Sequence, residues 1–363
     1  MKLHSALCLA VWLAQCCNAE PIPEPPGPYN VGVRRLVINF DNPDDPVSPN
    51  NISTEFLATI YYPTEDSPSA PATYIEPELA QMYADVYKFN ISHLTSTNRW
   101  NASYLSKCAG PSLVFAPGGW GPSTDGFVIL LSDLASRGYV IAALDHPYEQ
   151  PFLRFPNGTG LVGLPITTPS SQPLIDLLHA VRVREMLHFV HNWPKLVTEL
   201  AAPFRKTRIG AFGHSFGGSS ALSAGIESDA IVATLNQDGT IWGRAAHNDS
   251  SADAGKPTML LTVQGHNNDQ DQSFKNYTSN QSGWWRVISV NGTVHADWTD
   301  ATFWKRWGTT RPMGTIDGRR MADIRGTYVS AFFGEHIGGE ESPLLDENSK
   351  EWPEVTVYDG NDV

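Results

Sequence analysis

Short apolar runs alternate along the chain with segments whose apolar residues recur at helical spacing. The apolar runs of buried-strand length are 112–119, 139–147, 207–213, 230–238, 257–265 and 285–292. Segments 124–138 and 174–193 lie between such runs and have the three- to four-residue apolar spacing of helices. Strands that alternate with helices form a mostly parallel sheet with helices on both faces, so the pattern predicts an α/β fold.

Both ends of the chain depart from this alternation. Residues 34–41 and 56–63 are predicted to form two antiparallel strands ahead of it, and 64–109 has weak periodicity, which we interpret as an excursion on the surface. At the other end the tail 340–363 is acidic, although 354–360 can form a closing strand. A single α/β domain with short excursions fits this organisation best.

The first 19 residues resemble a signal peptide more than a buried helix. Lys2 gives a short positive start, an apolar stretch runs to Ala14, and small residues precede a cleavage site after Ala19. The apolar stretch is too short to cross a bilayer. Residues 20–30 are proline-rich and are expected to be extended. We therefore expect a soluble, secreted, extracellular protein whose one domain, with its acidic C-terminal tail, occupies 31–363.

Charge and cysteine content narrow the function classes. The 363-residue chain has a net charge of −13, and loss of Lys2 with the signal peptide takes this to −14. Such an excess of negative charge disfavours nucleic acid or an anionic membrane surface as the main partner. Cys8, Cys16 and Cys17 would leave with the signal peptide, and Cys108 would stay alone. We therefore expect no internal disulfide, so the core alone must stabilise the fold.

Asn-X-Ser/Thr triplets recur along the chain, and in a secreted protein they are candidate glycosylation sites on surface loops. Their asparagines are Asn51, Asn90, Asn101, Asn157, Asn248, Asn276, Asn280 and Asn291. Asn157 and Asn291 matter most, because they are expected near the segments that carry the chemistry described next.

The sequence Gly213-His214-Ser215-Phe216-Gly217 stands between a predicted strand and a segment, 215–226, that can begin a helix. Gly-X-Ser-X-Gly at such a junction is the nucleophile elbow of α/β-hydrolases, where the serine backbone is strained and larger residues in place of the glycines would collide. The helix N-terminus offers free N–H groups and a positive dipole end to a developing oxyanion. We predict Ser215 as the nucleophile and His214 as a packed or solvent-facing imidazole.

A nucleophilic serine needs a base, and the base needs an orienting acid; in this fold the chain order is serine, acid, histidine. His295 follows the last strand of the alternating part, where a loop returns over the carboxyl ends of the strands. His247 and His266 come too early for that loop, and His336 follows the C-terminal helix. His295 is the predicted base.

Two aspartates compete for the role of the acid. Asp238 ends the first strand after the elbow helix, whereas Asp269 follows the next strand, which is the position many α/β-hydrolases use. We favour Asp238, because catalytic side chains are held best at the ends of rigid elements, and keep Asp269 as the alternative. Asp297 and Asp300 are interpreted as helix-cap or surface residues beside the histidine.

Four segments together resemble the platelet-activating factor acetylhydrolase family of serine esterases. They are FAPGGWGPSTDGFVILLSDLASRGYVIAALDHPYE, GAFGHSFGGSSAL, LNQDGT and VNGTVHADWTD. The resemblance runs from about Ser112 to about Phe333 and implies an α/β-hydrolase fold with Ser215, Asp238 and His295 in the family's nucleophile, acid and base positions. PGGWG departs from the His-Gly pair common at the oxyanion loop. The predicted oxyanion donors are therefore the N–H of Phe216 and that of Trp120 or Gly119.

The resemblance implies hydrolysis, through an acyl-enzyme, of esters with short or oxidised acyl chains, above all the acetyl group of an ether phospholipid. Trp120 and Trp242, with Phe152 and Phe155, are candidates for the substrate pocket, although aromatic side chains also fill cores. The alternatives are a secreted cutinase or polyester hydrolase, a general carboxylesterase and a non-catalytic binding module. The sequence has no zinc-ligand spacing and no phosphate-binding loop, so we expect neither metal nor cofactor, and at most transient contact with a lipid surface.

Overall fold

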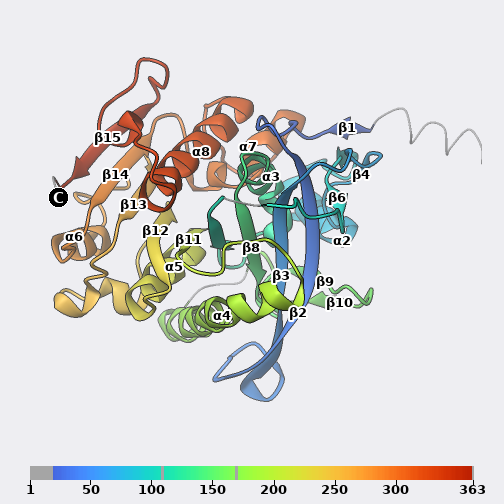
Figure 1. Ribbon diagram of the computed structural model, residues 1–363, viewed down its shortest axis with the longest axis horizontal. Helices are drawn as coiled ribbons and strands as arrows, with labels where there is room; N and C mark the ends of the chain where they lie inside the picture. The colour runs from blue at the N-terminus through green and yellow to red at the C-terminus, as the bar shows by residue number, and fades with distance from the viewer. Residues whose placement is uncertain (1–18, 108–109, 168–170, 362–363) are drawn as a thin grey trace, which may run out of the picture.

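The structure is a computed structural model that describes residues 19–107, 110–167 and 171–361 (Figure 1). Within these residues ten strands form one sheet in the order β15-β14-β13-β12-β11-β7-β8-β3-β2-β6. Their bounds are β2 (Asn30–Pro43), β3 (Ile52–Thr64), β6 (Arg99–Trp100), β7 (Ser112–Ala116), β8 (Val140–Asp145), β11 (Ile209–His214), β12 (Ile231–Gln237), β13 (Thr258–Val263), β14 (Trp285–Val290) and β15 (Val355–Gly360). The strands from β8 to β14 in this order are parallel, while β3 joins β8, and β15 joins β14, in antiparallel fashion.

Helices cover both faces of this sheet. They are α2 (Pro77–Tyr87), α3 (Val128–Ser136), α4 (Gln172–Glu199), α5 (Phe216–Glu227), α6 (Gln272–Ser279), α7 (Ala301–Trp304) and α8 (Gly318–Phe333). Figure 1 shows α3, α7 and α8 on one side of the sheet and α4 and α5 on the other. Short turns of 3₁₀ or π-helix complete the elements: η1 (Pro49–Asn51), η2 (Thr124–Gly126), η3 (Gly243–Ala246), η4 (Ser250–Ala252), η5 (His295–Trp298), η6 (Lys305–Trp307), η7 (Gly334–Gly338) and η8 (Pro343–Leu345).

The central strands are apolar at every position because both of their faces are covered. In β7, Leu113 and Phe115 belong to the core beneath α3 and α8, whereas Val114 and Ala116 belong to the core beneath α4 and α5. Alternate side chains of a strand point to opposite faces, so a strand buried on both sides cannot show polar alternation. The observed mixed sheet with helices on both faces confirms the predicted fold class.

Segment 64–109 is less peripheral than its weak periodicity predicted. It contains α2, which buries Leu79 and Tyr83, and Tyr83 and Phe89 both pack against the indole of Trp304. Two small sheets lie beside the main one, and their strands are β1 (Glu20–Pro21), β4 (Ala72–Thr73), β5 (Leu94–Ser96), β9 (Phe152–Arg154) and β10 (Gly160–Val162). The prediction of a surface excursion was therefore wrong for α2, which contributes to the main core.

The outer elements agree with the expectations from the sequence. The two early antiparallel strands are β2 and β3, and the predicted closing strand is β15. The predicted signal peptide, up to residue 18, and Cys108 lie outside the described residues. None of the helices in the part of the chain that the structure describes combines the length and the apolar character needed to cross a bilayer.

Candidate active site

The nucleophile elbow forms where β11 passes into α5. Ser215 lies between the two elements with φ 55° and ψ −124°, a backbone conformation that a residue with a side chain rarely adopts. A Cβ on Gly213 would lie 2.4 Å from the carbonyl carbon of Gly217, and one on Gly217 would lie 2.2 Å from the Ala116 oxygen. The turn therefore closes only because both flanking positions lack a side chain.

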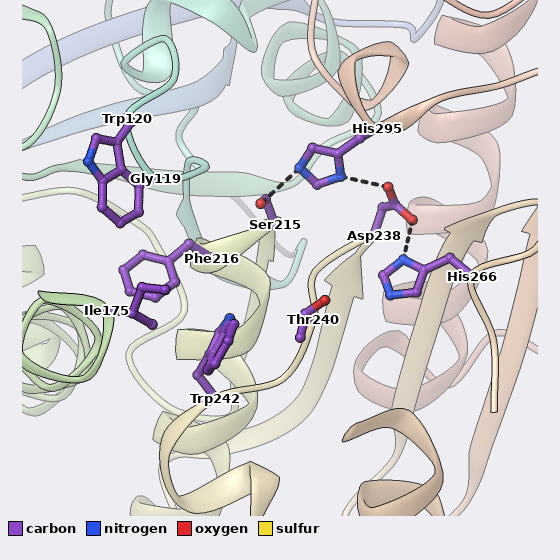
Figure 2. A pocket seen from close by; sticks show the side chains of 10 residues that line it. All are labelled: Gly119, Trp120, Ile175, Ser215, Phe216, Asp238, Thr240, Trp242, His266 and His295. Atoms are coloured by element: carbon purple, nitrogen blue, oxygen red, sulfur yellow. Dashed lines mark hydrogen bonds and ion pairs between the residues drawn. The ribbon is translucent and has the colours of Figure 1, made fainter. Parts of the chain in front are cut away.

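The structure brings the predicted serine, histidine and aspartate into one chain of hydrogen bonds (Figure 2). His295, the first residue of η5, places its Nε2 2.9 Å from Ser215 Oγ and its Nδ1 2.6 Å from Asp238 Oδ2. Because an ionised carboxylate only accepts hydrogen bonds, Nδ1–H donates to Asp238, and Nε2 is left to accept the Ser215 hydroxyl proton. This is the arrangement in which an imidazole can act as a base toward a serine.

Asp238 follows β12 directly, and its carboxylate is 2% exposed. Its backbone is also unusual, with φ 56°. The second carboxylate oxygen, Oδ1, accepts the Val263 N–H at 3.1 Å and lies 2.7 Å from Nδ1 of His266. Burial alone would raise the pKa of Asp238, but the hydrogen bonds from His266 and His295 lower it to about 2. The Asp238 carboxylate is thus ionised at neutral pH.

Sequence reasoning missed His266, which it considered only as a base and set aside. Its ring lies between two carboxylates, with Nδ1 against Asp238 and Nε2 2.9 Å from Asp271 Oδ2. Burial would lower the pKa of His266, but the hydrogen bonds to Asp238 and Asp271 raise it to about 9. The contact of His266 with Asp238 could have been expected only with the order of the strands in hand. Because β12 and β13 are neighbours in a parallel sheet, residues just beyond their carboxyl ends meet.

The competing candidates occupy other surroundings. The carboxylate of Asp269 accepts the Tyr358 hydroxyl, whereas the carboxylate at His295 comes from Asp238. Nδ1 of His247 lies 3.0 Å from the Ser251 hydroxyl. The ring of His336 packs against Trp284, with 4.4 Å between the ring centroids. The geometry therefore favours the set Ser215, Asp238 and His295 over these alternatives.

Two further aspartates and one histidine support the loop that carries His295. Asp297 accepts the Val294 N–H at 2.9 Å and so acts as a cap, as predicted. Asp300 stands at the N-cap position of α7, and its carboxylate accepts the N–H of Ile129 at the start of α3 at 3.0 Å, so the prediction of a helix cap is confirmed. The residue is fully buried and also accepts the Tyr74 hydroxyl at 2.7 Å, so the alternative of a surface residue was wrong. His214 is packed; its Nε2–H donates to the backbone carbonyl of His295 at 3.2 Å. The pKa of His214 lies well below its usual value, mainly because the ring is buried and also because His295 is nearby. The His214 ring is therefore neutral.

A cavity of about 370 Å³ opens above the Ser215 hydroxyl. It is lined by Gly119, Trp120, Ile175, Ser215, Phe216, Asp238, Thr240, Trp242, His266 and His295 (Figure 2). Both predicted pocket tryptophans are among these residues. Phe152 and Phe155 are not, because they pack in two separate hydrophobic clusters near β9. Ile175 and Thr240 were missed, since nothing in their local sequence distinguishes them from other helix and loop residues.

The predicted oxyanion donors border this cavity. Phe216 is the first residue of α5, where backbone N–H groups have no acceptor inside the helix. Trp120 has a φ of 53°, and its backbone N–H faces the carboxylate of Glu149. Burial raises the pKa of Glu149, and the hydrogen bond from this N–H lowers it. Because Glu149 already engages the Trp120 N–H and Gly119 also lines the cavity, the geometry of the loop 117–121 favours the Gly119 N–H as the second donor.

A buried ion pair holds this oxyanion loop from behind. The guanidinium of Arg182, on α4, donates to both carboxylate oxygens of Glu149, at 2.6 and 2.7 Å, and both side chains are almost completely buried. The same guanidinium donates to the carbonyl oxygens of Pro117, at 2.5 Å, and Gly118, at 3.1 Å. The carbonyls of Pro117 and Gly118 share their peptide planes with the N–H groups of Gly118 and Gly119, so these contacts also fix the direction of those N–H groups.

Comparisons with known proteins agree with this arrangement. Residues 176–342 match the family model described as "Platelet-activating factor acetylhydrolase, isoform II". A protein of Arthroderma benhamiae named "Probable 1-alkyl-2-acetylglycerophosphocholine esterase" is 25% identical over 376 residues, covering 93% of this chain and 94% of that protein. A "Platelet-activating factor acetylhydrolase" of Cavia porcellus is 21% identical over 380 residues, covering 94% and 82% respectively.

A solved structure gives the same picture of the fold. The ferulic acid esterase from Streptomyces cinnamoneus superposes with a TM-score of 0.80 at 26% identity, covering 94% of this chain and all of that one. The names of the family and of these relatives support esterase activity. The matches confirm the resemblance indicated by the sequence motifs: the chain is similar to the platelet-activating factor acetylhydrolases and has the α/β-hydrolase fold.

Proposed function

We propose that this chain is a secreted serine esterase that removes a short acyl group from a phospholipid through an acyl-enzyme. The observation that carries the proposal is the hydrogen-bonded series Ser215–His295–Asp238, set on a nucleophile elbow at the floor of an open cavity. The names of the Arthroderma benhamiae and Cavia porcellus relatives support the substrate class, an ether phospholipid with an acetyl group.

The catalytic cycle follows from the atoms in place. Ser215 Oγ attacks the ester carbonyl while His295 Nε2 takes its proton, and Asp238 holds the imidazole in the required tautomer. The carbonyl oxygen becomes an oxyanion that accepts from the Phe216 N–H and from one N–H of the oxyanion loop, each worth about 3 kcal/mol of barrier. The imidazolium then protonates the departing alkoxide, which leaves the acyl group on Ser215. Water, deprotonated by His295, releases the acid and restores the serine.

Secretion rests on the signal-peptide pattern and on the Asn-X-Ser/Thr triplets. The asparagines of these triplets are exposed or half-buried, as glycosylation requires. Sequencing the N-terminus of protein recovered from culture medium tests the proposal. A mature chain that begins at Glu20 supports it, and retention of all the protein inside the cells contradicts it.

The sharpest test compares Ser215→Ala with an equivalent change at an exposed serine, Ser67→Ala. We expect the wild type and Ser67→Ala to release acetate from a 1-alkyl-2-acetylglycerophosphocholine, and Ser215→Ala to fall by about 10⁶ in kcat. A phosphonate probe should label the first two proteins and not the third. Acetate release or probe labelling that survives in Ser215→Ala would refute the mechanism and favour a binding module.

Acyl-chain preference tests the substrate class separately. Nitrophenyl esters of increasing chain length, measured beside acetylated and long-chain phospholipids, should show the highest kcat/KM for short acyl groups. A preference for long chains, with Ser215→Ala still inactive, would leave the mechanism in place and reassign the substrate to that of a lipase or a polyester hydrolase.

A second candidate substrate is an ester of an aromatic acid. Three aromatic side chains, Trp120, Phe216 and Trp242, line the cavity together with Ser215, and aromatic rings can pack against a flat acyl group. The similarity to the ferulic acid esterase structure supports this alternative. Methyl ferulate in the same substrate panel distinguishes the two: a kcat/KM above that for the acetylated phospholipid would favour the aromatic ester.

A further inference from the structure

His266 contacts Asp238, the acid of the proposed triad (Figure 2), and on its other side it contacts a second carboxylate, that of Asp271. Nδ1 lies 2.7 Å from Asp238 Oδ1 and Nε2 lies 2.9 Å from Asp271 Oδ2. Asp271 is itself held, because its Oδ2 accepts the Thr240 hydroxyl at 3.0 Å and its Oδ1 accepts the backbone N–H of Ser273 at 2.8 Å. His266 is therefore clamped on both sides by groups that the backbone positions.

The hydrogen-bond partners of its two ring nitrogens indicate that the His266 ring is positively charged. Each ring nitrogen faces a carboxylate oxygen, and an ionised carboxylate can only accept. Both nitrogens must then carry a proton, which makes the ring an imidazolium. The surroundings of the ring are compatible with a positive charge. The charged groups that face it are both carboxylates, Asp238 beyond β12 and Asp271 at the start of α6. The ring of Phe274, also on α6, stacks on it with 4.5 Å between the ring centroids. The pKa of His266, raised to about 9 by these carboxylates, agrees with that charge.

We propose that His266 is a positioning residue whose positive charge, held between Asp238 and Asp271, orients the Asp238 carboxylate and sets the pH at which His295 becomes a base. The inference rests on the proposed function, since it acts through the triad. Two histidines share one carboxylate, with His266 on Oδ1 and His295 on Oδ2. His266 therefore offsets part of the negative charge that Asp238 presents to His295.

The discriminating measurement is the pH profile of His266→Gln. Glutamine keeps an amide donor for Asp238 and removes the charge. We expect the acid limb of kcat/KM to move to higher pH by about one unit, with a lower kcat and with KM changed by less than about twofold. The exposed His247 provides the matched control, and His247→Gln should leave the profile in place. A merely structural role would lower activity at all pH values without moving the limb.

A second variant keeps the proposal testable if His266→Gln does not fold. His266→Asn carries a shorter amide and removes the same positive charge, so the limb should move in the same direction. An unchanged acid limb in the folded variants would overturn the inference, and so would a large rise in KM with the limb unchanged, which would make His266 a substrate contact. Neither result touches the proposed serine mechanism, which the activity of Ser215→Ala tests independently.

Discussion

The two sides of the cavity are built from the same kinds of groups and are buried to very different extents. On the acid side, a buried carboxylate meets two histidines whose side chains are 19% and 48% exposed, His266 and His295. On the oxyanion side, the guanidinium of Arg182 and the carboxylate of Glu149 are 0% and 1% exposed. His295, the proposed base that must exchange protons, is the most exposed of these groups, whereas the two groups that hold the backbone of the oxyanion loop are shielded from water.

The difference predicts where each side fails when it is mutated. A buried ion pair that loses one partner leaves an uncompensated charge, so damage on the oxyanion side should show mainly as lost stability. On the acid side the partners are near solvent and their contacts are tied to proton transfer, so damage should show mainly as a changed rate or a changed pH profile. The following experiments test that division.

The largest effect is expected from Asp238→Asn. The amide oxygen can remain with the Val263 N–H and His266, which leaves the amide N–H facing His295 Nδ1. An N–H donor at that place favours the wrong tautomer of His295, and kcat should fall by about 10⁴. The measurement is kcat with an acetyl ester, alongside unfolding in urea. Asp269→Asn is the matched control and should retain near-normal turnover. A larger loss in the control would transfer the role of the acid to Asp269.

The oxyanion side should respond through folding. Arg182→Met strands the buried Glu149 carboxylate and is expected to destabilise the protein by about 3–5 kcal/mol, measured as the free energy of unfolding in urea. The double variant Arg182→Met with Glu149→Leu removes both charges and should recover much of that loss. The comparison would break down if the double variant were as unstable as the single one, or if Arg182→Met lowered only the rate.

The smallest effect is a change in the pH dependence of stability. The pKa of His266 is raised from 6.5 to about 9, so its contribution to stability is complete below pH 6.5 and is lost as the pH rises through about 9. The unfolding temperature of the wild type should fall by about 2–4 °C more over that interval than that of His266→Gln. Parallel curves for the two proteins would show that the ring carries no extra proton in the folded state.

Much of the architecture could be predicted from the sequence because local pattern and burial agree in the central strands. β7, β8 and β11 are apolar on both faces, and the glycines around Ser215 have one geometric explanation. The packing of helix α2 in the core was not predicted, because Tyr83 of α2 packs against Trp304, which is far away in the chain. The burial of Asp300 was not predicted for the same reason, since its hydrogen-bond partners Tyr74 and Ile129 are also far away in the chain.

The candidate site shows the same limit at closer range. Ser215, Asp238 and His295 could be chosen because each stands at a strand end in the chain order of the fold. His266 also stands beyond a strand end, but its role depends on which strand lies beside β13, and that is a property of the sheet rather than of the local sequence. The ion pair behind the oxyanion loop depends in the same way on where α4 packs. The catalytic roles themselves stay predictions until the variants are measured.

Three residues around the cavity, Trp120, Ser215 and Asp238, have positive φ angles of 53°, 55° and 56°. Each such conformation costs a residue with a side chain about 1–3 kcal/mol. Directed evolution for heat resistance alone would reward glycine at these positions and erase the cavity wall, the nucleophile or its acid. A screen for more thermostable variants must therefore also select for turnover.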